Sequence, residues 1–127
     1  MTFMWADLSV RRSKIASKSK RKGNNFELEI VKELRNIGYG GCVSSRSKDK
    51  LADANKIDIV DVNQELPVNI QSKYTQNIPN YFDIRDACTD KSKPFCLIWK
   101  KAGKNGEDSR GTVAVIPVKY FYELIKK

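Results

Sequence analysis

Four short segments rich in β-branched and apolar residues constrain the fold of this chain more than any other feature. Each has the length and composition of a β-strand, and they are residues 57–62, 67–73, 95–99 and 112–116. Residues 57–62 are apolar on both faces, which is typical of a central strand. A short turn at 63–65 predicts a hairpin between this segment and 67–73. Residues 39–46 predict one further strand ahead of these four.

An amphipathic helix is predicted before the strands. Across residues 25–37 the apolar positions recur every three or four residues, at Phe26, Ile30, Leu34 and Ile37. Asn24 or Asn25 is the expected N-cap of this helix. Gly38 is the expected residue just beyond its end, because glycine tolerates the backbone conformation found there.

Two further helices are expected, over residues 81–89 and 118–125. The last of them carries Phe121, Leu124 and Ile125 on the side that we expect to face the core. The predicted order is helix, three strands, helix, two strands, helix. This order favours an α/β fold with a mixed central β-sheet flanked by helices.

The size and composition are those of one globular domain. The chain has 127 residues, of which 40% are hydrophobic and 31% charged. No segment approaches the roughly 20 apolar residues of a membrane span. The N-terminus lacks the apolar region and cleavage site of a signal peptide. We therefore expect a cytoplasmic protein with no membrane partner.

Positive charge is concentrated at the N-terminus. Residues 1–22 hold seven basic residues and one acidic residue, so they carry +6 of the net charge of +9. We expect a flexible basic arm over 1–22 and one ordered domain over 23–127. Such an arm favours contact with nucleic acid, because lysine and arginine release counterions from the phosphate backbone. A solvated tail without a partner is the alternative.

The absence of histidine excludes several kinds of active site. A Ser–His triad, a Cys–His pair and a histidine-based zinc site cannot form. The cysteines are Cys42, Cys88 and Cys96, and no two of them form a CxxC motif. We expect all three to be small buried residues in a reducing compartment.

A few polar residues occupy positions that are informative about chemistry. Asp58 interrupts an apolar strand. Gln71 and Lys73 lie two residues apart on the next strand, so they point to one face, and the hairpin can bring Asp58 close to them. Glu27 lies in the first turn of the predicted helix. Two carboxylates and an amide oxygen suit Mg²⁺, and a lysine beside such a metal can orient a water that attacks a phosphodiester.

Four motifs follow one another in the order known from a nuclease family: KGNNFE at 22–27, SSRS at 44–47, IDIV at 57–60 and IQSK at 70–73. Over about residues 22–125 the chain resembles the PD-(D/E)XK nuclease superfamily, which has the restriction-endonuclease-like fold. It is most similar to the small Holliday-junction-resolvase-like and phage-type endonucleases of that superfamily, with a QxK variant of the last motif.

The resemblance implies a role for each motif residue. Glu27, Asp58 and Gln71 would bind the metal, and Lys73 would assist the nucleophilic water. The implied cofactor is Mg²⁺, for which Mn²⁺ can substitute, with no organic cofactor. Two positions depart from the family pattern. Ile57 replaces a proline that is not a ligand, and the neutral Gln71 replaces an acidic residue, which should weaken metal affinity.

The resemblance also implies a substrate and an assembly. The activity would be that of a Mg²⁺-dependent DNA endonuclease that hydrolyses phosphodiester bonds in branched or Holliday-junction DNA, as in DNA recombination. Resolvase-like enzymes act as homodimers because two strands are cut symmetrically. An apolar cluster in residues 1–8 offers a dimer contact. The expected setting is the cytoplasm of a bacterial, archaeal or phage-infected cell.

Residues near the motifs are expected to contact DNA, and they are Lys20, Arg21, Lys22, Ser45, Arg46, Lys48, Lys50 and Tyr74. Arg46 can grip a phosphate with two guanidinium nitrogens, and a surface turn is its alternative role. Tyr74 can stack on a base, and packing in the core is its alternative role.

Every candidate also has a purely structural interpretation. Glu27 can cap its helix, Asp58 can be part of a structural ion pair, and Gln71 with Lys73 can form a solvated strand face. The whole chain likewise has two rival functions. One is a non-catalytic DNA-binding protein on the same fold, with Gln71 as the mark of lost metal binding. The other is a basic RNA-binding accessory protein.

Overall fold

A five-stranded β-sheet forms the centre of the protein, which the computed structural model describes over residues 20–48 and 55–127. The strand order is β1-β2-β3-β4-β5, and only the pair β3–β4 is parallel. This mixed sheet confirms the predicted α/β fold. The strands are β1 (Cys42–Ser44), β2 (Ile59–Asp61), β3 (Asn69–Thr75), β4 (Phe95–Lys101) and β5 (Gly111–Val115).

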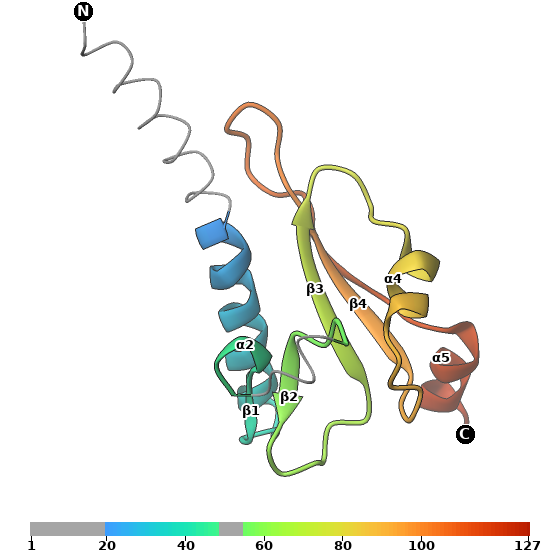
Figure 1. The fold of residues 1–127 in the computed structure, drawn as a ribbon. Helices are drawn as coiled ribbons and strands as arrows, with labels where there is room; N and C mark the ends of the chain where they lie inside the picture. Colours follow the sequence, from blue (N-terminus) through green and yellow to red (C-terminus); the bar gives the residue numbers. More distant parts are fainter. Residues whose placement is uncertain (1–19, 49–54) are drawn as a thin grey trace, which may run out of the picture.

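Helices cover both faces of the sheet. Figure 1 shows the N-terminal helix (20–36) and α4 (Tyr81–Ala87) on opposite sides of β3 and β4. A single turn, α2 (Ser45–Lys48), follows β1, and α5 (Val118–Ile125) closes the chain. The predicted order of long helices and strands is confirmed. None of the helices within the described ranges is long and apolar enough to cross a membrane.

The N-terminal helix begins earlier than its apolar pattern predicts. It already includes Lys20 and continues through Gly23 and Asn24, so the predicted N-cap at Asn24 or Asn25 is wrong. Lysine and arginine are good helix formers, and one glycine costs a helix only about 1 kcal/mol. The last three residues of the predicted arm, 20–22, are therefore helical. The rest of the predicted arm and the apolar cluster at 1–8 lie outside the described residues.

The end of this helix is the predicted one. Gly38 has a φ of 119°, which is strained for any residue with a side chain. The Gly38 N–H donates to the carbonyl of Arg35, and the Tyr39 N–H donates to that of Leu34 at 2.9 Å. This pair of bonds is a Schellman motif, which satisfies two of the last carbonyls of the helix. The motif turns the chain from the helix towards β1.

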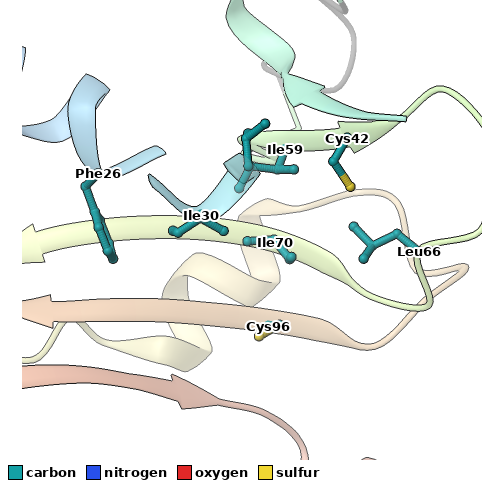
Figure 2. Packing of buried hydrophobic residues seen from close by; sticks show 8 residues of the cluster. Phe26, Ile30, Cys42, Ile59, Leu66, Ile70 and Cys96 are labelled. Atoms are coloured by element: carbon teal, nitrogen blue, oxygen red, sulfur yellow. The ribbon is translucent and has the colours of Figure 1, made fainter. Parts of the chain in front are cut away.

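The hydrophobic core has one part on each face of the sheet. Ile59, Ile70 and Leu97 are at most 2% exposed, and burying each side chain contributes roughly 1.5–3 kcal/mol. On one face, the N-terminal helix packs on the strands through a cluster that includes Phe26, Ile30, Val31, Cys42, Leu66 and Cys96 (Figure 2). On the other face, α4 packs through Tyr81 and Ile84 onto Ile57, Cys88 and Phe95.

The predicted hairpin forms, but β2 is short. Its antiparallel pairing with β3 has Ile59 opposite Ile70, and β2 is an interior strand of the sheet, between β1 and β3. The Asp61 carboxylate ends β2 by accepting three backbone N–H groups, from Asn63, Glu65 and Leu66. Tight local turns of this kind remove residues from strand pairing.

The predicted strand at 39–46 is also shorter than expected. β1 has only three residues, because the chain turns into α2 at Ser45. Serine is frequent where a helix begins, and SSRS contains three serines in four residues.

The prediction that one side of α5 faces the core is wrong. Phe121, Leu124 and Ile125 are 46%, 59% and 57% exposed, and α5 has no buried residue. The helix follows β5, an edge strand whose first four residues are exposed, so little of the sheet is available to cover it.

The three cysteines are buried and free, as predicted, and burial raises the pKa of the Cys96 thiol to about 11.

Candidate functional site

A pocket of about 280 Å³ gathers the four residues that the motifs single out. Glu27, Asp58, Gln71 and Lys73 all line it, together with Arg46. They come from the N-terminal helix, from the residue just before β2, from β3 and from α2, so residues far apart in the sequence meet at one place. Lys20, seven residues before Glu27 on the same helix, lines the same pocket.

Glu27 is a buried acid in the interior of a helix. It is 4% exposed, and seven residues of the helix precede it in the described chain. The capping role is therefore excluded, because capping residues act at the first turn. Its Oε1 accepts a hydrogen bond from Arg46 Nη2 at 2.9 Å, and its Oε2 accepts one from Ser44 Oγ at 3.3 Å.

Asp58 lies where β2 and β3 separate. Its backbone N–H donates to the Ile70 carbonyl at 2.8 Å, just before the first residue of β2. Its Oδ2 accepts the Ser72 N–H at 2.8 Å and the Ser72 hydroxyl at 3.2 Å. The Asp58 carboxylate thus accepts the Ser72 N–H in place of a backbone carbonyl of a neighbouring strand. This arrangement brings a charged side chain into the gap between the strands.

Both carboxyl groups ionise less readily than ordinary ones. Burial raises the pKa of Glu27, and the nearby charge of Asp58 raises it further, while Arg46 opposes the shift. Burial also raises the pKa of Asp58, while the Ser72 hydrogen bonds and the charges of Lys73 and Arg46 oppose that shift. A buried and a half-buried carboxylate that repel each other favour the binding of a cation.

Gln71 brings an amide oxygen that has no partner. The residue is 6% exposed, and its Oε1 is buried without a hydrogen bond to any described residue. A buried polar oxygen without a partner costs about 1–3 kcal/mol, so a ligand that fills this role would be stabilising. An amide oxygen is a hard donor of the kind that Mg²⁺ and Mn²⁺ accept.

The donor set fits one hard divalent cation that keeps several waters. Within residues 20–48 and 55–127, no three Asp, Glu, His or Cys side chains cluster to form a complete metal site. The two carboxylates together with Gln71 Oε1 supply three oxygens, and Mg²⁺ typically uses only one or two carboxylates. A metal would share Glu27 with Arg46, because each carboxylate oxygen has two lone pairs.

Lys73 is half-buried in the pocket wall. It follows Gln71 by two residues on β3, so the two side chains share a face of the sheet, as predicted. Lys73 and Asp58 line the same pocket, and the positive charge of Lys73 lowers the pKa of Asp58. The solvated strand face considered for Gln71 and Lys73 is not what forms, because Gln71 is buried.

The residues predicted to contact DNA are placed in different ways. Arg46 is tied to Glu27 and to the Asn24 side chain, with its own side chain 45% exposed. Ser45 is fully buried, so its predicted DNA contact is wrong. Lys20, Arg21 and Lys22 are exposed on the N-terminal helix, and the side chain of Lys48 and the whole of Lys50 lie outside the described part.

Tyr74 packs in the way its alternative role describes. The centres of the Tyr74 and Phe26 rings are 5.9 Å apart in an edge-to-face arrangement, and the Lys100 ammonium lies 5.0 Å from the centre of the Tyr74 ring. Lys100 also pairs with Glu29 at 3.5 Å. Tyr74 therefore links β3 and β4 to the helix that carries Glu27.

Sequence reasoning missed the residues that hold the site together. Asn24, Ser44 and Ser72 bond to Arg46, Glu27 and Asp58, respectively. Asn24 belongs to the KGNNFE motif and Ser44 to the SSRS motif, so an expected contact between these two motifs could have identified both residues.

Comparisons with family models, with curated proteins and with solved structures find no match for this chain.

Proposed function

We propose that this protein is a metal-dependent DNA endonuclease of the PD-(D/E)XK superfamily with the restriction-endonuclease-like fold. One observation carries the proposal. A buried carboxylate (Glu27), a half-buried one (Asp58), an amide oxygen without a partner and a lysine, taken from three separate segments, line one small pocket. A purely structural ion-pair network does not account for the buried Gln71 Oε1 without a partner, and a metal ligand role does.

The residues of the pocket have different roles. Glu27, Asp58 and Gln71 hold Mg²⁺ or Mn²⁺, and Lys73 orients the attacking water and offsets negative charge at the phosphate. When bound, the metal polarises a phosphoryl oxygen and makes water a stronger nucleophile. Arg46 reaches a phosphate from the rim, because nearly half of its side chain is exposed.

The charge of the chain favours nucleic acid as the substrate. Lys20–Lys22 extend the helix that carries Glu27, and Lys20 lines the pocket itself. A duplex or branched DNA seated there meets basic side chains directly beside the scissile phosphate. Branched or junction DNA and a homodimer are the substrate and assembly that we favour. Three buried free cysteines support a reducing cytoplasm as the setting.

A second function, DNA binding without cleavage, has one observation in its favour. Arg46 already pairs with Glu27, and the third donor is a neutral amide, so the pocket holds a cation of its own. A site with this pairing binds metal more weakly than one with three acids. The discriminating property is divalent-metal-dependent cleavage.

The test is a cleavage assay with labelled four-way junction DNA, the matched linear DNA duplex and the matched RNA duplex. Each substrate is incubated with Mg²⁺, Mn²⁺ or EDTA. Asp58→Asn is the informative variant, since its side-chain oxygen can still accept the Ser72 N–H while the charge is lost. Asp108→Asn, in the exposed loop before β5, is the matched control.

Metal-dependent cleavage of DNA that Asp58→Asn abolishes and Asp108→Asn retains supports the proposal. The junction and duplex lanes then identify the preferred geometry. DNA binding without cleavage in either metal refutes the nuclease and favours the second function. Preferential binding to RNA favours an RNA-binding accessory protein.

A further inference from the structure

A second pocket of about 280 Å³ lies at the far end of the β4–β5 pair, outside the site described above. Its lining combines one tryptophan with two basic residues, and consists of Trp99, Lys101, Arg110, Gly111, Thr112 and Val113. The metal-site residues contribute nothing to it. A tryptophan and two cations that line one pocket are a side-chain combination that suits a nucleotide, with the base on the ring and the phosphate on the cations.

The sheet register places this pocket beside Lys73. Lys73 pairs with Trp99 across the parallel strands β3 and β4, and Trp99 pairs with Val113 across β4 and β5. Paired side chains point to the same face of a sheet, and neighbouring strands lie about 4.8 Å apart. Lys73, Trp99 and Val113 therefore form one row that leads from the candidate active site to the second pocket.

This end of the sheet face is open. Phe95, on the same face four residues earlier in β4, is buried under α4. α4 does not extend over the row that contains Trp99, because Val113 is 51% exposed and Trp99 is only half-buried. Figure 1 shows α4 beside the middle of β4 and the β4–β5 connection beyond the upper end of that strand.

The tryptophan ring is held in a fixed position. Its Nε1–H lies 2.9 Å from Thr75 Oγ1 and 3.2 Å from the Thr75 carbonyl, so the polar edge of the indole is anchored on β3. The Lys101 ammonium is anchored on the Gln76 carbonyl of the same region. An aromatic ring fixed in advance loses little entropy when a base stacks on it.

We propose that this pocket binds an unpaired nucleotide of the strand that is cut, close to the scissile phosphate. Trp99 stacks on the base, and Lys101 and Arg110 contact the phosphate. The inference rests on the proposed nuclease function and deepens it. A substrate with an unpaired base next to the cleavage position, such as a branch or an overhang, is the class that this pocket selects.

The test measures binding in EDTA, so that cleavage plays no part. In a Trp5→Phe background, where Trp99 is the remaining tryptophan, short oligothymidylate is titrated against tryptophan fluorescence. The affinity of every variant, including those without Trp99, is measured by the fluorescence anisotropy of a dye-labelled oligomer. An oligomer with the same phosphates and abasic sugars is the matched ligand. Trp99→Leu removes the ring, Trp99→Phe retains a smaller one, and Tyr122→Leu on α5 is the control for losing an exposed aromatic residue.

The proposal predicts that oligothymidylate quenches Trp99 and that the abasic oligomer does not. It predicts that Trp99→Leu binds oligothymidylate roughly tenfold more weakly, with Trp99→Phe in between and Tyr122→Leu unchanged. For Trp99→Leu the two oligomers should bind alike. Equal binding of both oligomers by the parent protein, which requires no variant to fold, overturns the proposal.

The cleavage assay distinguishes a failure of this inference from a failure of the nuclease function on which it rests. If Mg²⁺-dependent cleavage occurs and the parent protein does not distinguish the two oligomers, the nucleotide pocket is refuted and the nuclease stands. If Trp99 distinguishes the oligomers and no metal supports cleavage, the pocket stands as a binding site and the nuclease is refuted.

Discussion

Arg46 Nη2 lies 2.9 Å from Glu27 Oε1, and this ion pair joins the one-turn helix after β1 to the N-terminal helix. The Glu27 side chain is 5% exposed and the Arg46 side chain is 45% exposed, so the acid is desolvated while the base remains within reach of solvent. Arg46 also contacts Asn24, one turn before Glu27. Glu27 is thereby held in place before any metal or substrate binds.

Arg46→Gln is expected to lower the free energy of unfolding of the metal-free protein by about 1–3 kcal/mol, because it leaves the Glu27 charge buried without its partner. Urea unfolding at neutral pH measures the change. Arg85→Gln is the matched control, since Arg85 and Asp86 form an exposed pair and such pairs contribute about 0–1 kcal/mol. Equal effects of the two substitutions would contradict a structural role for Arg46.

Gln71→Glu is expected to strengthen Mn²⁺ binding about tenfold or more, because a third carboxylate adds attraction for the cation. The same change should destabilise the metal-free protein, since it buries another negative charge beside Asp58 and Glu27. Calorimetric titration with Mn²⁺ measures the first effect, and urea unfolding in EDTA measures the second. Gln71→Leu, which removes the donor oxygen, is the control and should weaken Mn²⁺ binding. Unchanged Mn²⁺ affinity in both variants would exclude Gln71 as a ligand.

The raised pKa values of the two carboxyl groups predict a pH dependence with a definite sign. In the folded state Asp58 holds its proton to higher pH than in the unfolded chain. Its contribution to the free energy of unfolding therefore falls as pH rises from the ordinary carboxyl range through the raised pKa. Asp58→Asn lacks this contribution, so in EDTA its stability relative to wild type should increase from about pH 4 to about pH 8.

Urea unfolding of both proteins across that range is the measurement. The comparison with Asp58→Asn cancels Asp61 and Asp90, whose pKa values are lowered and whose effects have the opposite sign. A stability difference that does not change with pH would mean that Asp58 ionises normally in the folded protein.

Gly38→Ala is expected to cost about 1–2 kcal/mol of stability, because a φ of 119° is strained for a residue with a Cβ. No atom lies within 4 Å of the added Cβ, so the cost is conformational rather than steric. Gly23→Ala, within the same helix and also in open space, is the control and should be neutral or stabilising. Thermal unfolding of the two variants checks the difference in sign.

The parts of the fold that depend on local patterns could be predicted from the sequence. The hairpin of β2 and β3, the strands β4 and β5 and the Schellman end at Gly38 each depend on alternation or on one turn residue. The start of the N-terminal helix could not be predicted, because Lys20–Lys22 carry no apolar periodicity. The exposure of α5 was missed because periodicity identifies an apolar face but not the surface that would bury it.

The candidate site was predictable as a set of residues but not as a geometry. The spacing of Gln71 and Lys73 and the unusual position of Asp58 identify them in the sequence. The link from Arg46 to Glu27 depends on the turn of α2, which the sequence pattern presented as the end of a strand. The bond from Asp58 to the Ser72 N–H depends on where β2 leaves β3, and alternation alone does not determine that point.

The most direct test of the central claim is the single-turnover rate of DNA cleavage by Lys73→Met, compared with Lys119→Met on the exposed side of α5. DNA affinity in Ca²⁺ is measured in parallel, so that loss of binding is not mistaken for loss of chemistry. We expect Lys73→Met to bind DNA nearly as well as wild type and to cleave it at least about 100-fold more slowly, which is the loss expected for a positioned proton-transfer or charge-stabilising group. Lys119→Met should cleave normally. Cleavage by Lys73→Met at the wild-type rate would contradict the assignment of this pocket as the active site.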